Sequence, residues 1–345
     1  MAEEFKILIA SDNHLGFLEN DPIRGADSFR TFDEILDIAN RAEVDMVLLG
    51  GDLFHDSNPS RECIHRTMQI LRNRCVGDRP ISINVLSSPG APVRRVGGDD
   101  DSNGGNNNNN GDEEYSYGND DPTEQRKRRG SEKYVNTCTP KNPNFVDPNY
   151  NISLPVYSIH GNHDDPTGKG AGLSALDLLA DANFINYFGK TQRVDDITVV
   201  PILLKKGNIG VALYGLGSIR NERLYRTLEN EKLSLMIPGD EDEDGNGWFK
   251  IFVVHQNRAN RSPKSYFKEE KIPKEIDFVL WGHEHDCRIN PVRLFDTTFL
   301  SQPGSSIAIT LDEKENIKKY IPQFSRLQKS SFHIFFFFLT GTLES

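Results

Sequence analysis

The chain has 345 residues, of which 36% are apolar, and this length suits one large domain or two small ones. Its net charge of −11 argues against a protein that binds nucleic acid through a basic surface overall, although two acidic runs, at 99–101 and 240–244, distort the balance. The four cysteines form no CxxC pair, which excludes a structural zinc site of the cysteine type and fits a reducing compartment. No apolar run approaches the roughly 20 residues that a membrane span needs.

Short apolar runs bounded by polar or glycine-containing segments predict six buried strands. They cover residues 6–10, 45–49, 156–159, 209–214, 251–254 and 278–281. Apolar residues at helical spacing predict four helices between these strands, at 28–42, 61–71, 172–182 and 221–229. Strands that alternate with helices indicate an α/β fold.

Two regions depart from this alternation. Residues 90–150 are rich in Asn, Gly and Asp, so they bury too little apolar surface to offset the entropy of ordering. Because the pattern resumes at residue 154, we predict a mostly disordered insertion within one domain that spans residues 1–320. The basic cluster at 126–129 fits a nuclear import signal, a phosphate contact or a solvated charge run. Residues 321–345 form an atypical tail that we interpret as a truncation or a segment foreign to the fold, because 331–345 resembles neither a helix face nor a strand.

Polar side chains follow five of the predicted strands at their carboxyl ends. In open α/β sheets, binding sites form beyond the carboxyl ends of the strands, so these side chains are expected to lie close together. The potential metal ligands among them are Asp12, His14, Asp52, Asn162, His255, His283 and His285. We assign no role to the three histidines outside these motifs, which are His65, His160 and His333.

The types of these side chains indicate the kind of metal centre. Carboxylate, imidazole and amide oxygen without thiolate suit manganese, iron or zinc. Seven ligands are too many for one ion with an open position, but they suit two ions about 4 Å apart that share a carboxylate, the spacing used in phosphate ester hydrolysis. Asp52 is the expected shared ligand, because it follows a buried strand and a double glycine.

The order of the motifs resembles the calcineurin-like metallophosphoesterase superfamily. Asp-x-His, Gly-Asp, Gly-Asn-His-Asp, a later His and Gly-His-x-His follow one another along this chain. Longer strings are similar to the eukaryotic meiotic recombination eleven family of double-strand-break repair nucleases, the nuclease subunits of the MRN complex. The strings lie at 24–29, 161–168, 212–218, 254–258, 281–285 and 301–306, and the resemblance covers about residues 5–90 and 145–320.

The resemblance implies a fold and a role for each ligand. The fold is a two-sheet sandwich flanked by helices, in an αββα order. Asp12, His14, Asp52 and His285 would hold one ion, and Asp52 would be shared with the second ion. The residues that would hold this second ion together with Asp52 are Asn162, His255 and His283.

The resemblance also implies a reaction and its partners. It implies a manganese-dependent nuclease, a 3′→5′ exonuclease on duplex DNA and an endonuclease on single strands, that acts in the nucleus in double-strand-break repair and meiotic recombination. Magnesium, iron or zinc are alternative metals. His163 would be the general acid that protonates the leaving 3′ oxygen, or would steer the phosphate. His55 would position the phosphate, and Asp164 would orient His163 through its other ring nitrogen. The implied partners are DNA, a second copy of the chain, an SMC-like ATPase and nibrin.

Two further interpretations remain open. A phosphomonoesterase or protein phosphatase shares the metal motifs, although the strings at 254–258 and 24–29 favour the nuclease. A non-catalytic scaffold is the third interpretation, and the complete ligand set argues against it.

Overall fold

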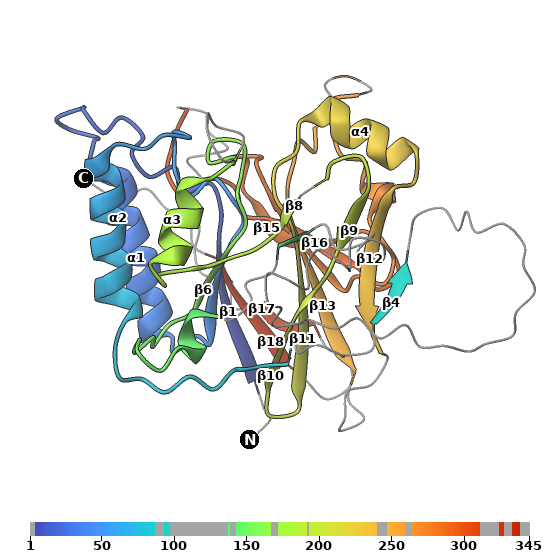
Figure 1. Ribbon diagram of the computed structural model, residues 1–345, viewed down its shortest axis with the longest axis horizontal. Coiled ribbons are helices and arrows are strands. Elements are labelled where there is room, and N and C mark those ends of the chain that lie inside the picture. The colour runs from blue at the N-terminus through green and yellow to red at the C-terminus, as the bar shows by residue number, and fades with distance from the viewer. Residues whose placement is uncertain are drawn as a thin grey trace, which may run out of the picture.

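The computed structural model describes residues 4–86, 93–96, 137–138, 143–166, 172–191, 193–239, 247–259, 262, 264–310, 324–327 and 333–338. Two β-sheets face each other within these residues, and helices α1, α2 and α3 lie on one side of the pair (Figure 1). Helix α4 and a small third sheet lie on the other side. The α/β fold class and the αββα order of layers are therefore confirmed.

The first sheet carries the strands from the N-terminal part of the chain. Its strand order is β17 (Phe324–Leu327), β18 (His333–Phe338), β1 (Glu4–Ala10), β2 (Met46–Leu49), β6 (Val156–Ser158) and β7 (Asn186–Tyr187). From β18 to β7 each strand is parallel to its neighbour. The carboxyl ends of β1, β2 and β6 therefore meet at one edge of this sheet.

The second sheet has a parallel centre and antiparallel margins. Its strand order is β15 (Arg288–Arg293), β16 (Phe299–Gln302), β14 (Phe278–Gly282), β13 (Trp248–His255), β11 (Ile209–Leu216), β10 (Ile202–Lys206) and β3 (Asn84–Val85). Strands β11, β13, β14 and β16 run parallel, so the residues after β13 and β14 also leave the sheet at a common edge. Smaller pairings join β4 (Val93–Val96), β12 (Leu233–Pro238) and β9 (Ile197–Val199), and also β5 (Thr137–Cys138) and β8 (Lys190–Thr191).

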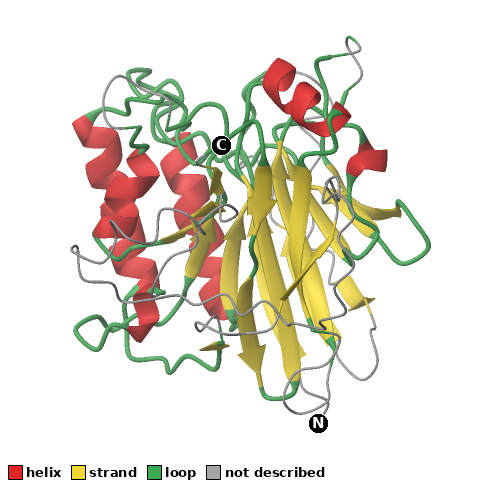
Figure 2. Cartoon of the chain, turned by 45° about the vertical axis from the view of Figure 1, so that its right-hand side comes forward, coloured by secondary structure: helices red, strands yellow, loops and turns green. Residues whose placement is uncertain are grey.

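The helices cover the sheets with apolar faces. Helix α1 (Asp27–Arg41), α2 (Arg61–Cys75) and α3 (Ala175–Asp181) pack on the outer face of the first sheet, and α4 (Asn221–Glu229) packs on the second (Figure 2). Two short 3₁₀ turns, η1 (Asn144–Val146) and η2 (Glu269–Lys271), complete the elements. The four predicted helices are confirmed, with boundaries within a few residues.

Three apolar clusters hold these layers together. The central cluster fills the space between the sheets and includes Ile7 of β1, Leu48 of β2 and Val253 of β13, all fully buried. The other two lie between each sheet and its outer layer. Because residues 7–10 of β1, 46–49 of β2 and 251–254 of β13 are buried on both faces of their sheets, these stretches are continuous apolar runs, which is why they are recognisable in the sequence.

The expectation that 331–345 is neither a helix face nor a strand is wrong for residues 333–338, whereas the origin of the tail stays a prediction. Residues 333–338 form β18, which pairs in parallel with β1 from Glu4↔His333 to Ile9↔Phe338. The backbone of β18 satisfies hydrogen-bonding groups at the edge of β1 that would otherwise be exposed. Residues 311–323, 328–332 and 339–345 lie outside the described residues.

The predicted insertion is also attached to the fold near both of its ends. Strand β4 at 93–96 pairs with β12, and residues 137–138 pair with β8. Residues 97–136, which include the basic cluster, lie outside the described residues. At the end of the insertion, Asn144 is buried and exchanges hydrogen bonds with Asn186.

Candidate metal centre

The carboxyl ends of the two sheets bring the predicted metal ligands together. Among the described residues, three groups of side chains have ligand atoms within 4.8 Å of one another and could hold a metal ion. Two of them consist of predicted ligands only, namely Asp12, His14 and His285, and Asp52, His255 and His283, and the third is His14, His55 and His163. Asn162 lies beside the second group, because its Oδ1 is 2.7 Å from Nδ1 of His283. All seven predicted ligands therefore lie in one region, although they come from five separate strand ends.

The backbone at the strand ends is turned in an unusual way. Asp12, His14, Asp52 and His283 all have positive φ angles, of 52°, 46°, 50° and 82°. Such angles are uncommon for residues other than glycine and cost free energy, so they persist where the surrounding structure imposes them. Half of the eight non-glycine residues with positive φ among the described residues are thus predicted metal ligands, which fits a site that the fold holds in position.

Asp52 stands between the two groups of ligands. Its Oδ2 lies 3.2 Å from Nε2 of His255 and 3.9 Å from Nε2 of His14, and its Oδ1 accepts the backbone N–H of His163 at 2.8 Å. Burial opposes ionisation of Asp52, but the His255 ring and the other neighbours outweigh it and hold the pKa of this carboxyl below its ordinary value. The carboxylate is therefore charged and placed to face both groups.

The polar atoms at the centre fit a cation. Oδ1 of Asp12, Oδ2 of Asp52 and Nε2 of His255 are buried and have no hydrogen-bond partner within the described residues. A buried polar atom without a partner is costly, so such atoms call for a ligand or an ion. Two carboxylate oxygens and an imidazole nitrogen that converge in this way form a suitable donor set for a divalent cation of the manganese, iron or zinc type.

Asp12 is fixed by its neighbours on one side only. Its Oδ2 accepts the Oγ–H of Ser11 at 2.5 Å and the backbone N–H of His283 at 3.2 Å. Its Oδ1 lies 3.7 Å from Nε2 of His285. Burial raises the pKa of Asp12, and the neighbouring Asp52 adds to this rise, because two carboxylates share the site. A bound cation would remove this penalty.

The two ring nitrogens of His255 have different environments. Nδ1 donates a hydrogen bond to the backbone oxygen of Gly50 at 2.8 Å, which leaves Nε2 to face Asp52. Burial alone would lower the pKa of His255, but the Asp52 carboxylate outweighs it and raises the pKa to about 10. A carbonyl that fixes the tautomer of a histidine is a common support for a metal ligand.

His14, His283 and His285 complete the imidazole ligands. Burial lowers the pKa of His14 and lowers the pKa of His283 to about 4, so both rings are neutral at physiological pH and able to bind a metal. Nε2 of His14 lies 3.2 Å from Nε2 of His285, on the side of the first group. Neither the His14 ring nor the His283 ring competes with a proton for the cation.

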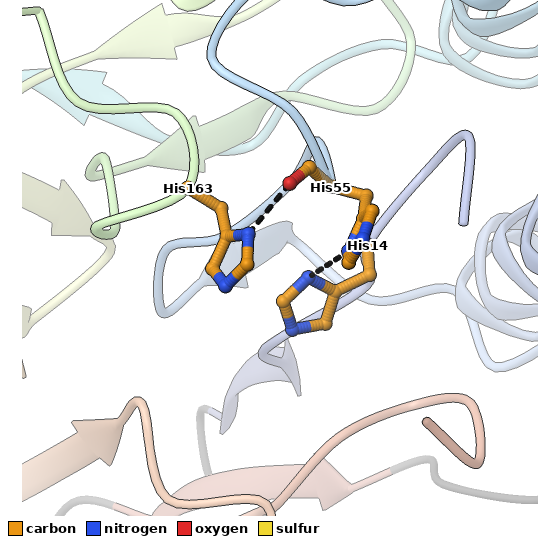
Figure 3. A group of neighbouring side chains, drawn as sticks. All are labelled: His14, His55 and His163. Carbon is orange, nitrogen blue, oxygen red and sulfur yellow. Dashed lines mark hydrogen bonds between the residues drawn. The ribbon is translucent and has the colours of Figure 1, made fainter. Parts of the chain in front are cut away.

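His163 and His55 lie at the edge of the centre, next to His14 (Figure 3). Nδ1 of His163 donates to the backbone oxygen of His55 at 2.5 Å, so its Nε2 is directed away from this bond. The two rings stack with their centroids 5.1 Å apart, and Nδ1 of His55 lies 3.4 Å from Nδ1 of His14. Burial lowers the pKa of His55.

The structure corrects the predicted role of Asp164. Its carboxylate does not contact the ring of His163, whose Nδ1 is bonded to His55 instead. Oδ2 of Asp164 accepts the backbone N–H groups of Leu53 and Phe54, and Oδ1 accepts that of Gly161. Asp164 is therefore a buried connection between the loops after β2 and β6, and the adjacency of His163 and Asp164 in the sequence gave no signal of this arrangement.

Other contacts of the site were not predicted. Ser305 donates its Oγ–H to the backbone oxygen of Asp12 at 3.0 Å, and Gly50 accepts from His255. Ser11 could have been found from its place directly before Asp12, whereas Ser305 lies 293 residues further along the chain. The buried His160 lies outside the ligand groups, with Nδ1 2.8 Å from the Tyr187 hydroxyl.

Two comparisons place these features among known proteins. The model of the calcineurin-like phosphoesterase family matches residues 5–90 and 108–287. These ranges contain the five strand ends that carry the ligands.

Proteins with similar sequences are double-strand break repair proteins. The chain is 43% identical over 318 residues to "Double-strand break repair protein MRE11" of Homo sapiens. This match covers 92% of the present chain and 38% of the human protein. It is 42% identical over 320 residues to the Mus musculus protein of that name and 39% identical over 327 residues to the Arabidopsis thaliana one. In both cases the match spans 39% of the relative, so the chain corresponds to about two fifths of these proteins.

Proposed function

This chain belongs to the calcineurin-like phosphoesterase family, and on that premise we propose that it is a metal-dependent phosphodiesterase that cleaves DNA in double-strand-break repair. The family supports hydrolysis of a phosphate ester assisted by divalent metal ions. The choice of DNA rests on the similarity to relatives whose names state a role in double-strand break repair. Because the chain spans only about two fifths of those relatives, their activity is proposed for it, not assigned.

The position of Asp52 is the observation that carries this proposal. One buried carboxylate oxygen without a hydrogen-bond partner among the described residues faces an imidazole of each ligand group, His14 on one side and His255 on the other. A carboxylate between two ligand groups is the arrangement expected of a two-metal site. A site for a single structural ion would not need the second group.

We assign the ligands accordingly. Asp12, His14 and His285 would hold one ion together with Asp52, while Asn162, His255 and His283 would hold the other with the same carboxylate. When bound, the two ions would stabilise the charge that develops on a phosphate ester during displacement. Manganese is the proposed metal, and magnesium, iron or zinc are the alternatives within the same donor chemistry.

His163 is proposed to handle the proton of the reaction. Its Nδ1–H is held by the backbone oxygen of His55, which leaves Nε2 to give a proton to the leaving 3′ oxygen. A positioned general acid contributes about 10²–10⁴-fold in rate. The stacked His55 ring would position the phosphate beside it.

The finer features of the proposal follow the relatives and the sequence. We propose a 3′→5′ exonuclease on duplex DNA and an endonuclease on single strands, which acts in the nucleus and also in meiotic recombination. The nuclease domain would span residues 1–320, with the insertion at about 90–150. A second copy of the chain, an SMC-like ATPase and nibrin are proposed partners. Among the described residues, no helix is both long and apolar enough to cross a membrane.

Digestion of end-labelled DNA tests the proposal. The wild-type chain and His163→Asn are incubated with 5′-labelled duplex in manganese, in magnesium and in chelator. Shortening from the 3′ end that requires manganese and is lost in the variant, while the variant still binds two ions, is the expected result. Hydrolysis of a small aryl phosphate or a phosphopeptide without cleavage of duplex or single-stranded DNA would replace the nuclease by the phosphatase alternative.

A further inference from the structure

A carboxylate that is not one of the predicted ligands connects two of the loops that carry them. Glu284 lies between His283 and His285 on the segment after β14. Its Oε1 accepts the backbone N–H of Arg258 at 2.8 Å and that of Ala259 at 2.9 Å. Arg258 follows His255 by three residues, on the segment after β13. Among the described residues, Glu284 belongs to none of the groups that are suited to hold a metal.

Side chains extend the connection between these segments. Nε of Arg258 donates to Glu269 at 2.6 Å, and a terminal nitrogen donates to Gln302 at 2.9 Å. The guanidinium carbon also lies 5.9 Å from the centre of the Trp281 ring. The segment after β13 is thus held by backbone contacts, which Glu284 accepts, and by the side chain of Arg258.

The pairing matters because the strands themselves end before the ligands are placed. The last register pair between β13 and β14 joins His255 to Gly282, so the pairing of these strands does not continue to His283 and His285. His283 then turns with a φ of 82°. Hydrogen bonds from two backbone N–H groups to one side-chain oxygen are directional and hold both amides in a defined position. They replace the sheet as the connection between the two segments.

We propose that Glu284 is a positioning residue, which fixes the spacing between His255 on one segment and His283 and His285 on the other. The inference rests on the proposed function, because it takes these three histidines as metal ligands. Groups that orient metal ligands from outside typically contribute 10–100-fold in metal affinity. Glu284 would act through the backbone of Arg258 and Ala259, without contact to substrate or metal.

Three substitutions separate this role from a simple effect of charge. Glu284→Gln removes the charge but keeps an oxygen where Oε1 accepts both amides. Glu284→Ala removes the charge and the acceptor, and Glu284→Asp keeps the charge on a side chain one methylene shorter. Glu270→Ala is the matched control, because Glu270 is an exposed glutamate in η2 and its loss changes the net charge by the same amount.

Binding of Mn²⁺ is measured directly, by the loss of the electron paramagnetic resonance signal of the free ion, with far-ultraviolet circular dichroism as a check on folding. We expect Glu284→Ala and Glu284→Asp to weaken binding by about 10–100-fold, and Glu284→Gln and Glu270→Ala to stay within about threefold of wild type. In DNA digestion, the manganese concentration for half-maximal rate should rise for Glu284→Ala, and saturating manganese should restore most of the rate. A purely structural role of Glu284 would not give this recovery.

Other outcomes overturn the proposal in distinguishable ways. If Glu284→Gln and Glu284→Ala weakened manganese binding equally, the charge of Glu284 would be the cause, and not its position as a hydrogen-bond acceptor. Wild-type binding in Glu284→Ala and Glu284→Asp would overturn the positioning role while the metal centre stands. A wild-type chain that binds fewer than two ions would overturn the proposed centre itself, and the role of Glu284 with it.

Discussion

Nε2 of His255 faces Oδ2 of Asp52 across 3.2 Å, and neither atom has a hydrogen-bond partner within the described residues. Burial alone would lower the pKa of His255, but the carboxylate raises it to about 10. In the metal-free protein, this ring therefore carries a proton at neutral pH. The same nitrogen is the proposed metal ligand, so a cation and a proton compete for it.

Metal binding is therefore expected to release a proton near pH 7. The affinity for the second ion should rise with pH, by up to about tenfold per unit while His255 remains protonated.

The stability of the metal-free protein should change with pH in the opposite direction, falling as the pH rises. Because the folded pKa of about 10 lies above the ordinary histidine value of 6.5, the contribution of His255 to stability is complete below about pH 6.5 and is lost as the pH rises through 10.

Isothermal titration calorimetry in two buffers of different ionisation enthalpy measures this release of protons. An observed binding enthalpy that differs between the buffers at pH 7 is the expected result. The same enthalpy in both buffers would show that His255 is already neutral before the ion binds.

Substitution of a single ligand should show which of the two ions that ligand holds. Removal of a ring from one group only, by His285→Ala or His283→Ala, should leave one strongly bound ion. Asp52→Ala should weaken both ions by about 100-fold or more, because each loses a charged ligand. Equilibrium dialysis with metal analysis counts the ions. The exposed Asp181→Ala is a charge-matched control that should still bind two, and retention of one strong ion in Asp52→Ala would contradict the shared position of this carboxylate.

Substitution of Asp164 should destabilise the fold even without metal. Asp164→Ala leaves the backbone N–H groups of Leu53, Phe54 and Gly161 without their acceptor in a buried place. At about 1–3 kcal/mol for each unsatisfied donor, the free energy of unfolding should fall by about 3 kcal/mol or more. Urea unfolding in chelator is the measurement, and Asp181→Ala should change the free energy by less than about 0.5 kcal/mol. A loss below 1 kcal/mol in Asp164→Ala would mean that water or a shift of the loops replaces the carboxylate.

Even one added methyl group next to Asp52 should disturb the metal centre. A Cβ on Gly161 would run into the carboxylate of Asp52 and its backbone nitrogen. We therefore expect Gly161→Ala to lower the affinity for manganese by about tenfold or more and to cost about 1–3 kcal/mol of stability. Gly77→Ala is the control, since its Cβ would approach only the Ser153 side chain, away from the ligands. Wild-type metal binding in Gly161→Ala, measured as above, would show that Asp52 can move without consequence.

The sequence alone determined the fold class, and it predicted which side chains lie together at the strand ends. The C-terminal halves of β1 and β13 and the whole of β2 are buried on both faces, so they stand out as apolar runs. The polar residues that follow them mark where ligands leave the sheet. Strand β18 was missed, because its pairing with β1 depends on residues more than 300 positions away in the chain. Patterns within one segment carry no information about such a partner.

Only the tertiary structure decided how the site residues contact one another. From the sequence, Asp164 was expected to orient the adjacent His163, yet its oxygens bond the backbone of Leu53, Phe54 and Gly161. Glu284 likewise looks like a spacer between two ligands until its contacts with the segment after β13 are seen. The local sequence determines which side chains occur at a strand end. It does not determine which atom each side chain faces, because that partner is placed only when loops from the two sheets pack against each other.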